Sequence, residues 1–244
     1  MEYDEEQLDD FESVKDPYHI LIFCDGSSST DNKSLGLKED YYSIATGAYA
    51  LVAIRYNDKE KSFDTLCTKS KAEFQWTASR SELEGALESL RTVLDLSKKN
   101  PKYKFTIYTD SRYIVDGYRK YLYMWAARNW VKMDGSEIKY RELWKEFWRL
   151  VRFELEYVRL NITWIKAHQN NKRLHAYYNN LVDSIANKTR IEYRKTQDTE
   201  YRKLLNEKNP LLKTPKLIYS NKIDSLRELK VPSSIQLKNE KFTK

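Results

Sequence analysis

The feature that most constrains the fold is a change in hydrophobic period along the chain. Between residues 19 and 69, apolar residues fall in runs of strand length, separated by turn-forming or polar residues. From Ser79 onward, apolar residues recur at the spacing of an amphipathic helix. Strand-like and helical segments then alternate to about residue 190, which is typical of an α/β domain.

The predicted strands are His19–Cys24, Gly47–Tyr56, Ser62–Lys69, Lys104–Thr109 and Asn161–Lys166. The predicted helices are Ser79–Asn100, Ser111–Tyr118, Ser136–Phe153 and Arg173–Arg190. This order of elements, βββαβααβα, predicts a five-stranded mixed sheet with helices on both faces. Residues 17–190 would form this domain, between an acidic, disordered tail at 1–16 and a basic, partly helical extension at 191–244.

Charge is distributed unevenly. The chain carries a net charge of +7, yet its first sixteen residues hold eight acids and one base, so the remainder carries about +14. A body this basic favours a polyanionic partner such as nucleic acid. Two cysteines, no apolar run of membrane-spanning length and an acidic start predict an intracellular protein of the cytoplasm or nucleus, neither secreted nor membrane-bound.

Four carboxylates stand where a sheet of this kind would bring them together. Asp25 and Asp110 each follow a predicted strand, and the ends of neighbouring strands lie close enough for two acids to share a cation. Glu82 falls in the first turn of the long helix, and Asp183 lies beside the apolar stripe of the last one. Clustered carboxylates repel one another unless a cation neutralises them, and their hard oxygen atoms favour Mg²⁺ or Mn²⁺ over zinc. Taken singly, each acid also has an ordinary structural explanation as a turn or helix-end residue.

The sequences flanking these acids narrow the choice. Five motifs occur in one order: Ile22–Ser27, Ser79–Leu83, Tyr108–Tyr113, Trp164–His168 and Asn179–Ala186. Together they resemble the ribonuclease H family, type 1, over roughly residues 19–188. The resemblance implies an endoribonuclease that hydrolyses the RNA strand of an RNA–DNA hybrid and leaves a 3′-hydroxyl and a 5′-phosphate. We expect the protein to be a monomer.

The resemblance also implies roles for particular residues. Asp25, Glu82, Asp110 and Asp183 match the acids that hold two Mg²⁺ ions, with Mn²⁺ as an alternative, and Asp25 would bridge the pair. His168 matches a catalytic histidine on a mobile loop, which assists proton transfer or product release. His19 and His175 have no such match and are predicted to be structural or surface residues.

Substrate contacts are implied in two places. Residues 121–132 resemble a basic protrusion that grips the DNA strand, and the segments around Gly26 and Ser79 would contact the RNA. The implied nucleic-acid-binding residues are Gly26, Ser27, Ser28, Ser79, Arg80, Arg112, Tyr121, Trp125, Arg128 and Lys132, with Arg119 and Lys120 as further phosphate contacts. Trp130 is the tryptophan of this stretch that we expect in the core.

The chain departs from the family pattern at Ala78, Arg112, Asn180 and the long loop 30–42, which affects substrate preference more than the metal site. Three alternatives stay open. The chain could be a non-catalytic nucleic-acid-binding relative, a ribonuclease H domain that works beside a reverse transcriptase or other polymerase, or a DNA nuclease of the same fold.

Overall fold

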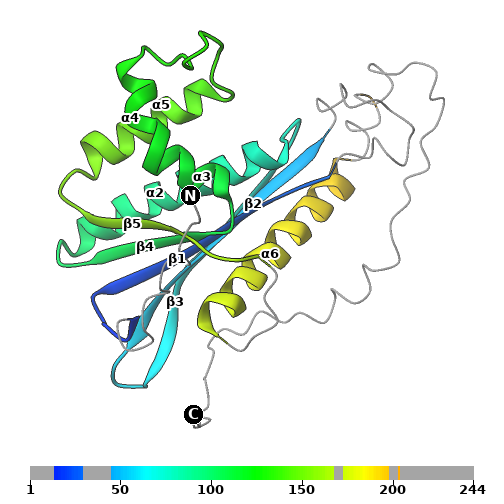
Figure 1. Ribbon diagram of the computed structural model, residues 1–244. Coiled ribbons are helices and arrows are strands. Elements are labelled where there is room, and N and C mark those ends of the chain that lie inside the picture. Colours follow the sequence, from blue (N-terminus) through cyan, green and yellow to red (C-terminus); the bar gives the residue numbers. More distant parts are fainter. Residues whose placement is uncertain (1–13, 30–44, 168–172, 198–202, 204–244) are drawn as a thin grey trace.

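A five-stranded sheet with helices on both sides forms the centre of the molecule (Figure 1). The computed structural model describes residues 14–29, 45–167, 173–197 and 203. The strands are β1 (His19–Ser29), β2 (Thr46–Asn57), β3 (Ser62–Phe74), β4 (Lys104–Thr109) and β5 (Arg159–Trp164). The helices are α2 (Ala78–Lys99), α3 (Arg112–Asp116), α4 (Leu122–Ala127), α5 (Arg141–Arg149) and α6 (Leu174–Thr196).

The sheet is mixed, as predicted. Its strands lie in the order β3-β2-β1-β4-β5. β2 pairs antiparallel with both β1 and β3, whereas β4 pairs parallel with both β1 and β5. A π-helical turn at Gly117–Tyr121 joins α3 to α4, and another at Leu150–Glu154 extends α5. When each continuous helical segment is counted once, the element order βββαβααβα is confirmed.

Several predicted boundaries were wrong. β1 does not end in a turn at Asp25, because it continues to Ser29 as a partner of β2. β3 likewise runs on to Phe74 against β2. α5 begins at Arg141 rather than at Ser136, although Ile138 before it is buried as expected. The tail 1–16 and the extension 191–244 lie largely outside the described residues, although α6 itself continues to Thr196.

The core lies on both faces of the sheet, which explains the continuous apolar run of β1. Ile20 and Ile22 pack into a cluster with α2 and α5, whereas Leu21 and Phe23 pack into a second cluster with α6. Alternate side chains of a strand point to opposite faces, so a central strand covered on both sides must be apolar throughout. Cys24 is buried and Cys67 is half-buried, and both are free thiols.

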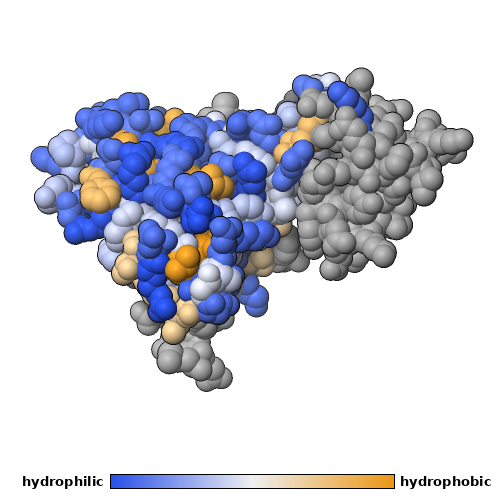
Figure 2. Space-filling view, turned by 90° about the horizontal axis from the view of Figure 1, so that it is seen from above, coloured by the Kyte–Doolittle hydropathy of each residue, from blue (hydrophilic) through white to orange (hydrophobic). Residues whose placement is uncertain are grey.

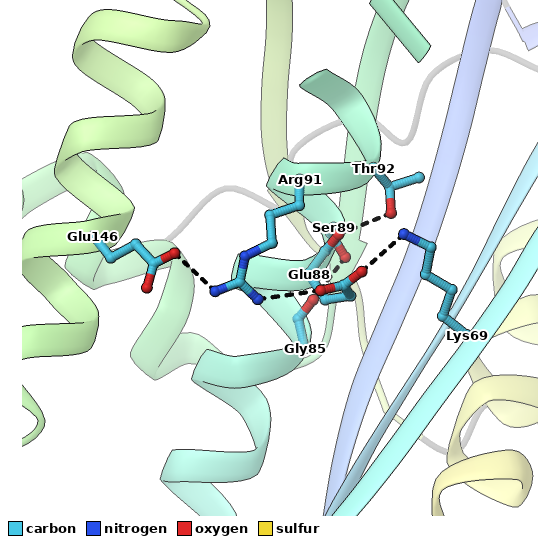
Figure 3. Close-up of polar contacts among 7 residues, drawn as sticks. All are labelled: Lys69, Gly85, Glu88, Ser89, Arg91, Thr92 and Glu146. Carbon is cyan, nitrogen blue, oxygen red and sulfur yellow. Dashed lines mark hydrogen bonds and ion pairs between the residues drawn. The ribbon is translucent and has the colours of Figure 1, made fainter. Parts of the chain in front are cut away.

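Polar contacts on α2 link the sheet edge to α5 (Figure 3). Glu88 accepts hydrogen bonds from Lys69 of β3 at 2.8 Å and from Arg91 at 3.1 Å. The other end of Arg91 donates to Glu146 of α5 at 2.8 Å. These side chains are partly exposed, so the network adds little to stability and mainly fixes the position of α5 against α2.

The segment from α3 to α5 rises from the sheet as a helical protrusion (Figure 1). Trp144 of α5 is fully buried at its base, donates from Nε1 to the Tyr113 hydroxyl at 2.7 Å and lies against Gly117. A Cβ atom at Gly117 would come within 2.2 Å of the Trp144 ring. The glycine in the π-helical turn is therefore required for this ring to pack.

Gly26 of β1 lies directly against the backbone of α2. A Cβ atom at this position would lie 2.4 Å from the Glu82 amide nitrogen and 2.9 Å from the Glu82 Cα. Both neighbours are backbone atoms, so they cannot move away as the end of a flexible side chain would. The absence of a side chain at Gly26 thus sets how closely the N-terminal part of α2 approaches β1.

We expect Gly26→Ala to lower the free energy of unfolding by about 3 kcal/mol, because the added methyl group would force β1 and α2 apart. Gly135→Ala is the matched control. Its φ of +80° would be strained for alanine, but an added Cβ would meet nothing within 4 Å, so we expect a loss of about 1 kcal/mol. Urea unfolding of the two variants measures the difference. Equal losses would show that the close approach is not important.

Candidate active site

Four acidic residues from four elements surround the end of the parallel part of the sheet. Asp25 lies on β1, two residues beyond Phe23, where pairing with β4 ends. Asp110 directly follows β4. Glu82 comes from the second turn of α2 rather than the first turn that the sequence predicted, because the helix begins at Ala78. Asp183 comes from α6, and the two helices approach from the two faces of the sheet.

Electrostatics show that the four carboxylates are close together. Burial, followed by the charges of Asp110, Asp183 and Glu82, raises the pKa of Asp25 to about 8, against the opposing effect of a hydrogen bond from the Gly26 amide. Burial and the charge of Asp110 also raise the pKa of Glu82 above its ordinary value. Repulsion of this kind marks a position where a cation would be stabilising.

Neutral donors orient three of these acids. Ser111 Oγ donates to Glu82 Oε2 at 2.7 Å. Asn179 Nδ2 donates to Asp110 Oδ2 at 3.0 Å, and Asn187 Nδ2 donates to Asp183 Oδ1 at 3.0 Å.

The sequence analysis missed these three donors as site residues. A signal for two of them was present, because Asn179 and Asn187 lie one helical turn before and after Asp183 and so share its face of α6. Ser111 was expected only as the N-cap of α3, a role that it also fills.

The donor set fits a hard divalent cation. Carboxylate oxygens are the ligands that Mg²⁺ and Mn²⁺ prefer, and no sulfur or imidazole atom is needed. In the described residues, no three His, Cys, Asp or Glu side chains already stand in an arrangement that could hold a metal ion. Each of Glu82, Asp110 and Asp183 instead accepts a hydrogen bond from a neighbour, as carboxylates that repel one another would.

The implied RNA-contacting residues lie next to this cluster. Ser28 Oγ donates to the Trp76 carbonyl at 3.4 Å, and the Arg80 guanidinium lies 5.6 Å from the Trp76 ring centre. Ser79 is half-buried in the first turn of α2. The Ser27 hydroxyl is different, because it is buried and points to α6, where it donates to Asn187 Oδ1 at 2.7 Å.

The protrusion presents aromatic and basic side chains. Tyr121 is exposed and stacks on Trp125, with ring centres 5.6 Å apart, and Trp125 in turn packs edge-on against Trp144. Arg128 and Lys132 are exposed.

One expectation for the protrusion, the core position of Trp130, needs correction, and the phosphate contacts of Arg119 and Lys120 stay predictions. Trp125 and Trp130 are both half-buried against the core, so Trp130 is not distinguished as the core residue. Arg119, expected at a phosphate, donates to the Ile162 carbonyl of β5 at 2.9 Å. Lys120 forms an ion pair with Asp116 at 2.9 Å.

Arg112, the remaining predicted nucleic-acid-binding residue, lies against Trp164. Its guanidinium lies 3.5 Å from the centre of the Trp164 ring, and Trp164 Nε1 donates to the Asp110 carbonyl at 3.0 Å. His19 and His175 are both buried, His19 beside Thr106 and His175 against Tyr108. His168 lies outside the described residues.

Comparison with known proteins identifies the family. The family model described as RNase H matches residues 17–191. The chain belongs to the RNase H family, type 1. It is 29% identical over 172 residues to ribonuclease HI of Haemophilus influenzae, covering 70% of this chain and 90% of the relative. It is 34% identical over 152 residues to ribonuclease H of Helicobacter pylori, covering 62% and 82%.

Solved structures agree on the RNase H fold. The solution structure of the PFV RNase H domain matches with a TM-score of 0.57 at 20% identity, covering 72% of this chain and 96% of that chain. Membership of the family confirms the predicted ribonuclease H enzyme class and fold. Among the described residues, no helix is both long and apolar enough to cross a membrane. Monomeric state, cellular compartment and a polymerase partner stay predictions.

The cost of gathering four acids in this RNase H chain leads to a stability prediction. We expect Asp25→Asn to raise the free energy of unfolding of the metal-free protein at pH 8 by on the order of 2 kcal/mol, with a matching rise in melting temperature. At pH 4 we expect the same substitution to change the stability little. The pKa of Asp25 is about 8 when folded, against an ordinary 3.8. The folded state therefore holds the proton more tightly, and the stability from this group is lost as pH rises through 8.

Asparagine carries no charge at either pH and can still accept the Gly26 hydrogen bond, which is 2.6 Å long in the native protein. Thermal unfolding in EDTA at the two pH values measures the effect, with Asp58→Asn in the exposed β2–β3 turn as the control. If the melting temperatures of Asp25→Asn and the native protein differed by the same amount at both pH values, the raised pKa of Asp25 would be contradicted.

Proposed function

We propose that this protein is an endoribonuclease that hydrolyses the RNA strand of RNA–DNA hybrids. The observation that carries the proposal is the convergence of Glu82, Asp110 and Asp183 on the buried carboxylate of Asp25, in a chain of the RNase H family. Retention of all four acids also argues against a non-catalytic relative, which would have no use for the repulsion that they create.

Asp25, Glu82, Asp110 and Asp183 would hold two Mg²⁺ ions. When bound, such ions activate the attacking water and neutralise the leaving oxygen, which produces a 3′-hydroxyl and a 5′-phosphate. The chain contributes the orientation of its acids through Ser111, Asn179 and Asn187. His168 is proposed to move a proton or to assist product release.

Substrate binding would use the protrusion and the start of α2. Exposed Tyr121, stacked on Trp125, offers an aromatic face for a sugar or base, and Arg128 and Lys132 offer positive charge to phosphates. Figure 2 views the molecule from the side of the protrusion and shows a face that is mostly hydrophilic, as a polyanion-binding surface would be. Backbone groups near Gly26–Ser28 and Ser79–Arg80 would contact the 2′-hydroxyls that distinguish RNA from DNA.

The function is tested by incubating the full chain with an end-labelled RNA–DNA hybrid, duplex RNA and duplex DNA, each with Mg²⁺ and with EDTA. We expect cleavage of the hybrid alone, in the RNA strand alone and only without EDTA. Ligation of the 5′-phosphate product confirms the position of the break. Cleavage of duplex DNA would instead favour a DNA nuclease of the same fold, and cleavage of the hybrid in EDTA would exclude the proposed metal dependence.

We expect Asp110→Asn to lower the cleavage rate at least about 1,000-fold while the dissociation constant for the hybrid changes less than about threefold, because one metal ligand is lost and the fold is kept. Single-turnover cleavage and a filter-binding titration measure the two quantities. Asp58→Asn, the same chemical change at an exposed turn, should leave both unchanged. Loss of hybrid binding in Asp110→Asn would mean that this acid acts through folding.

We expect Tyr121→Ala to weaken hybrid binding about tenfold with little change in the rate of the bound complex, because a stacking face is lost away from the acids. Tyr123→Ala is the matched control, since Tyr123 is also exposed but packs edge-on against Trp148. KM and kcat for hybrid cleavage separate the two effects. Equal losses of binding in both variants would exclude a specific role for the Tyr121–Trp125 stack.

A further inference from the structure

We propose that Asn187 and Arg190 of α6 are positioning residues that set the orientation of the Asp183 carboxylate for metal binding. The inference rests on the proposed function, because it concerns a proposed metal ligand. It adds two residues that the sequence analysis did not select, and it changes the role of Ser27 from an RNA contact to a part of this network.

The network runs from a cation to the acid in three steps. Arg190 Nε donates to Ser27 Oγ at 3.1 Å, and Arg190 Nη2 donates to Asn187 Oδ1 at 3.3 Å. Ser27 Oγ donates to the same Asn187 oxygen at 2.7 Å. Asn187 Nδ2 then donates to Asp183 Oδ1 at 3.0 Å.

Arg190 determines which way the Asn187 amide points. A guanidinium has donors only, so the amide atom that faces Arg190 must be the oxygen. The NH₂ group is consequently turned toward Asp183, whose ionised carboxylate has only acceptors. If the amide rotated by half a turn, its oxygen would face the carboxylate and its NH₂ group would face the guanidinium, and both contacts would become repulsive. Arg190 thus excludes the orientation of the Asn187 amide that could not donate to Asp183.

Ser27 connects this device to the other side of the site. Ser27 lies two residues after Asp25 on β1, so both side chains point to the face of the sheet that α6 covers, as Leu21 and Phe23 do. The Ser27 hydroxyl is buried and is used both as donor and as acceptor. The network therefore fixes the Asp183 carboxylate relative to β1, and hence relative to Asp25.

A direct role for the charge of Arg190 predicts the opposite result from a positioning role. A cation near the acids repels Mg²⁺, so its removal should tighten metal binding if charge alone matters. If Arg190 positions Asn187, its removal should weaken metal binding, because the amide can rotate. Residues that orient metal ligands in this way commonly change affinity by about 10–100-fold when they are substituted.

The experiment is a titration of the full chain with Mn²⁺, in which free Mn²⁺ is followed by electron paramagnetic resonance and no substrate is present. We expect the dissociation constant to rise about tenfold in Asn187→Leu and about threefold in Arg190→Leu. Arg190→Lys, which keeps the charge and one donor group, should fall between the native protein and Arg190→Leu. Ser27→Ala, a mild change, should raise the constant about twofold.

Lys188→Leu is the matched control, because it removes one cation from the exposed side of the same helix, where Lys188 is paired with Glu192. Its dissociation constant for Mn²⁺ should stay the same or fall slightly. Melting temperatures in EDTA identify any variant that fails to fold, and Ser27→Ala and Arg190→Lys then carry the test.

The outcomes separate the inference from the proposed function. If the Arg190→Leu and Asn187→Leu variants bind Mn²⁺ as tightly as the native protein, or more tightly, the positioning role is overturned. The proposed ribonuclease function would be unaffected by that result. A native protein that binds no Mn²⁺, or an Asp183→Asn variant that binds it equally well, would overturn the metal site itself.

Discussion

Repulsion among four buried or half-buried carboxylates is the constraint to which the rest of this structure responds. Burial, and then the charges of Asp110, Asp183 and Glu82, raise the pKa of Asp25. Such a group would separate if it stood on loops. Here each acid belongs to, or directly follows, a strand or helix that is buried on its own account, so hydrophobic packing on both faces of the sheet opposes the repulsion.

Three of the four acids accept hydrogen bonds from side chains that carry no charge. Ser111, Asn179 and Asn187 donate hydrogen bonds to three of the carboxylates through a hydroxyl and two amides. A neutral donor fixes the direction of a carboxylate and leaves its negative charge uncancelled, whereas a lysine or arginine in the same place would compete with a metal ion. In the Asp183 network, Arg190 donates hydrogen bonds to Ser27 and Asn187. The arrangement thus orients the ligands and preserves their charge.

The sequence predicted what depends on periodicity and order, and it failed where the outcome depends on contacts between distant segments. The strands and helices were located because each has a continuous apolar pattern. The continuation of β1 through Gly26 to Ser29 has no such pattern, since it depends on pairing with β2. The π-helical turn at Gly117 likewise depends on the Trp144 ring, which comes from a helix that begins more than twenty residues later.

The same limit applies to the site. The grouping of the acids followed from strand ends, because parallel strands bring their carboxyl ends to one edge. Asn187 could have been selected from its helical spacing to Asp183, but its amide orientation could not, since that depends on Arg190 and on a serine from β1. Spacing therefore identified the residues that share a face, and only the coordinates showed in which direction each hydrogen bond runs.

The protrusion, which carries the proposed substrate-binding residues, is attached to the sheet by contacts that do not involve the four acids. The Tyr121–Trp125 stack rests on Trp144, and α5, which carries Trp144, is fixed to α2 through Arg91 and Glu146. Arg91 lies about two and a half helical turns after Glu82 on α2. No contact in the network of Figure 3 involves the four acids. A shift of the protrusion would therefore leave the positions of the four carboxylates unchanged, and would alter only the position of a substrate bound to the protrusion. Because α2 carries both Arg91 and Glu82, its rigidity sets the distance between the Tyr121–Trp125 stack and the carboxylates. A bend in this helix would therefore move the protrusion relative to the acids.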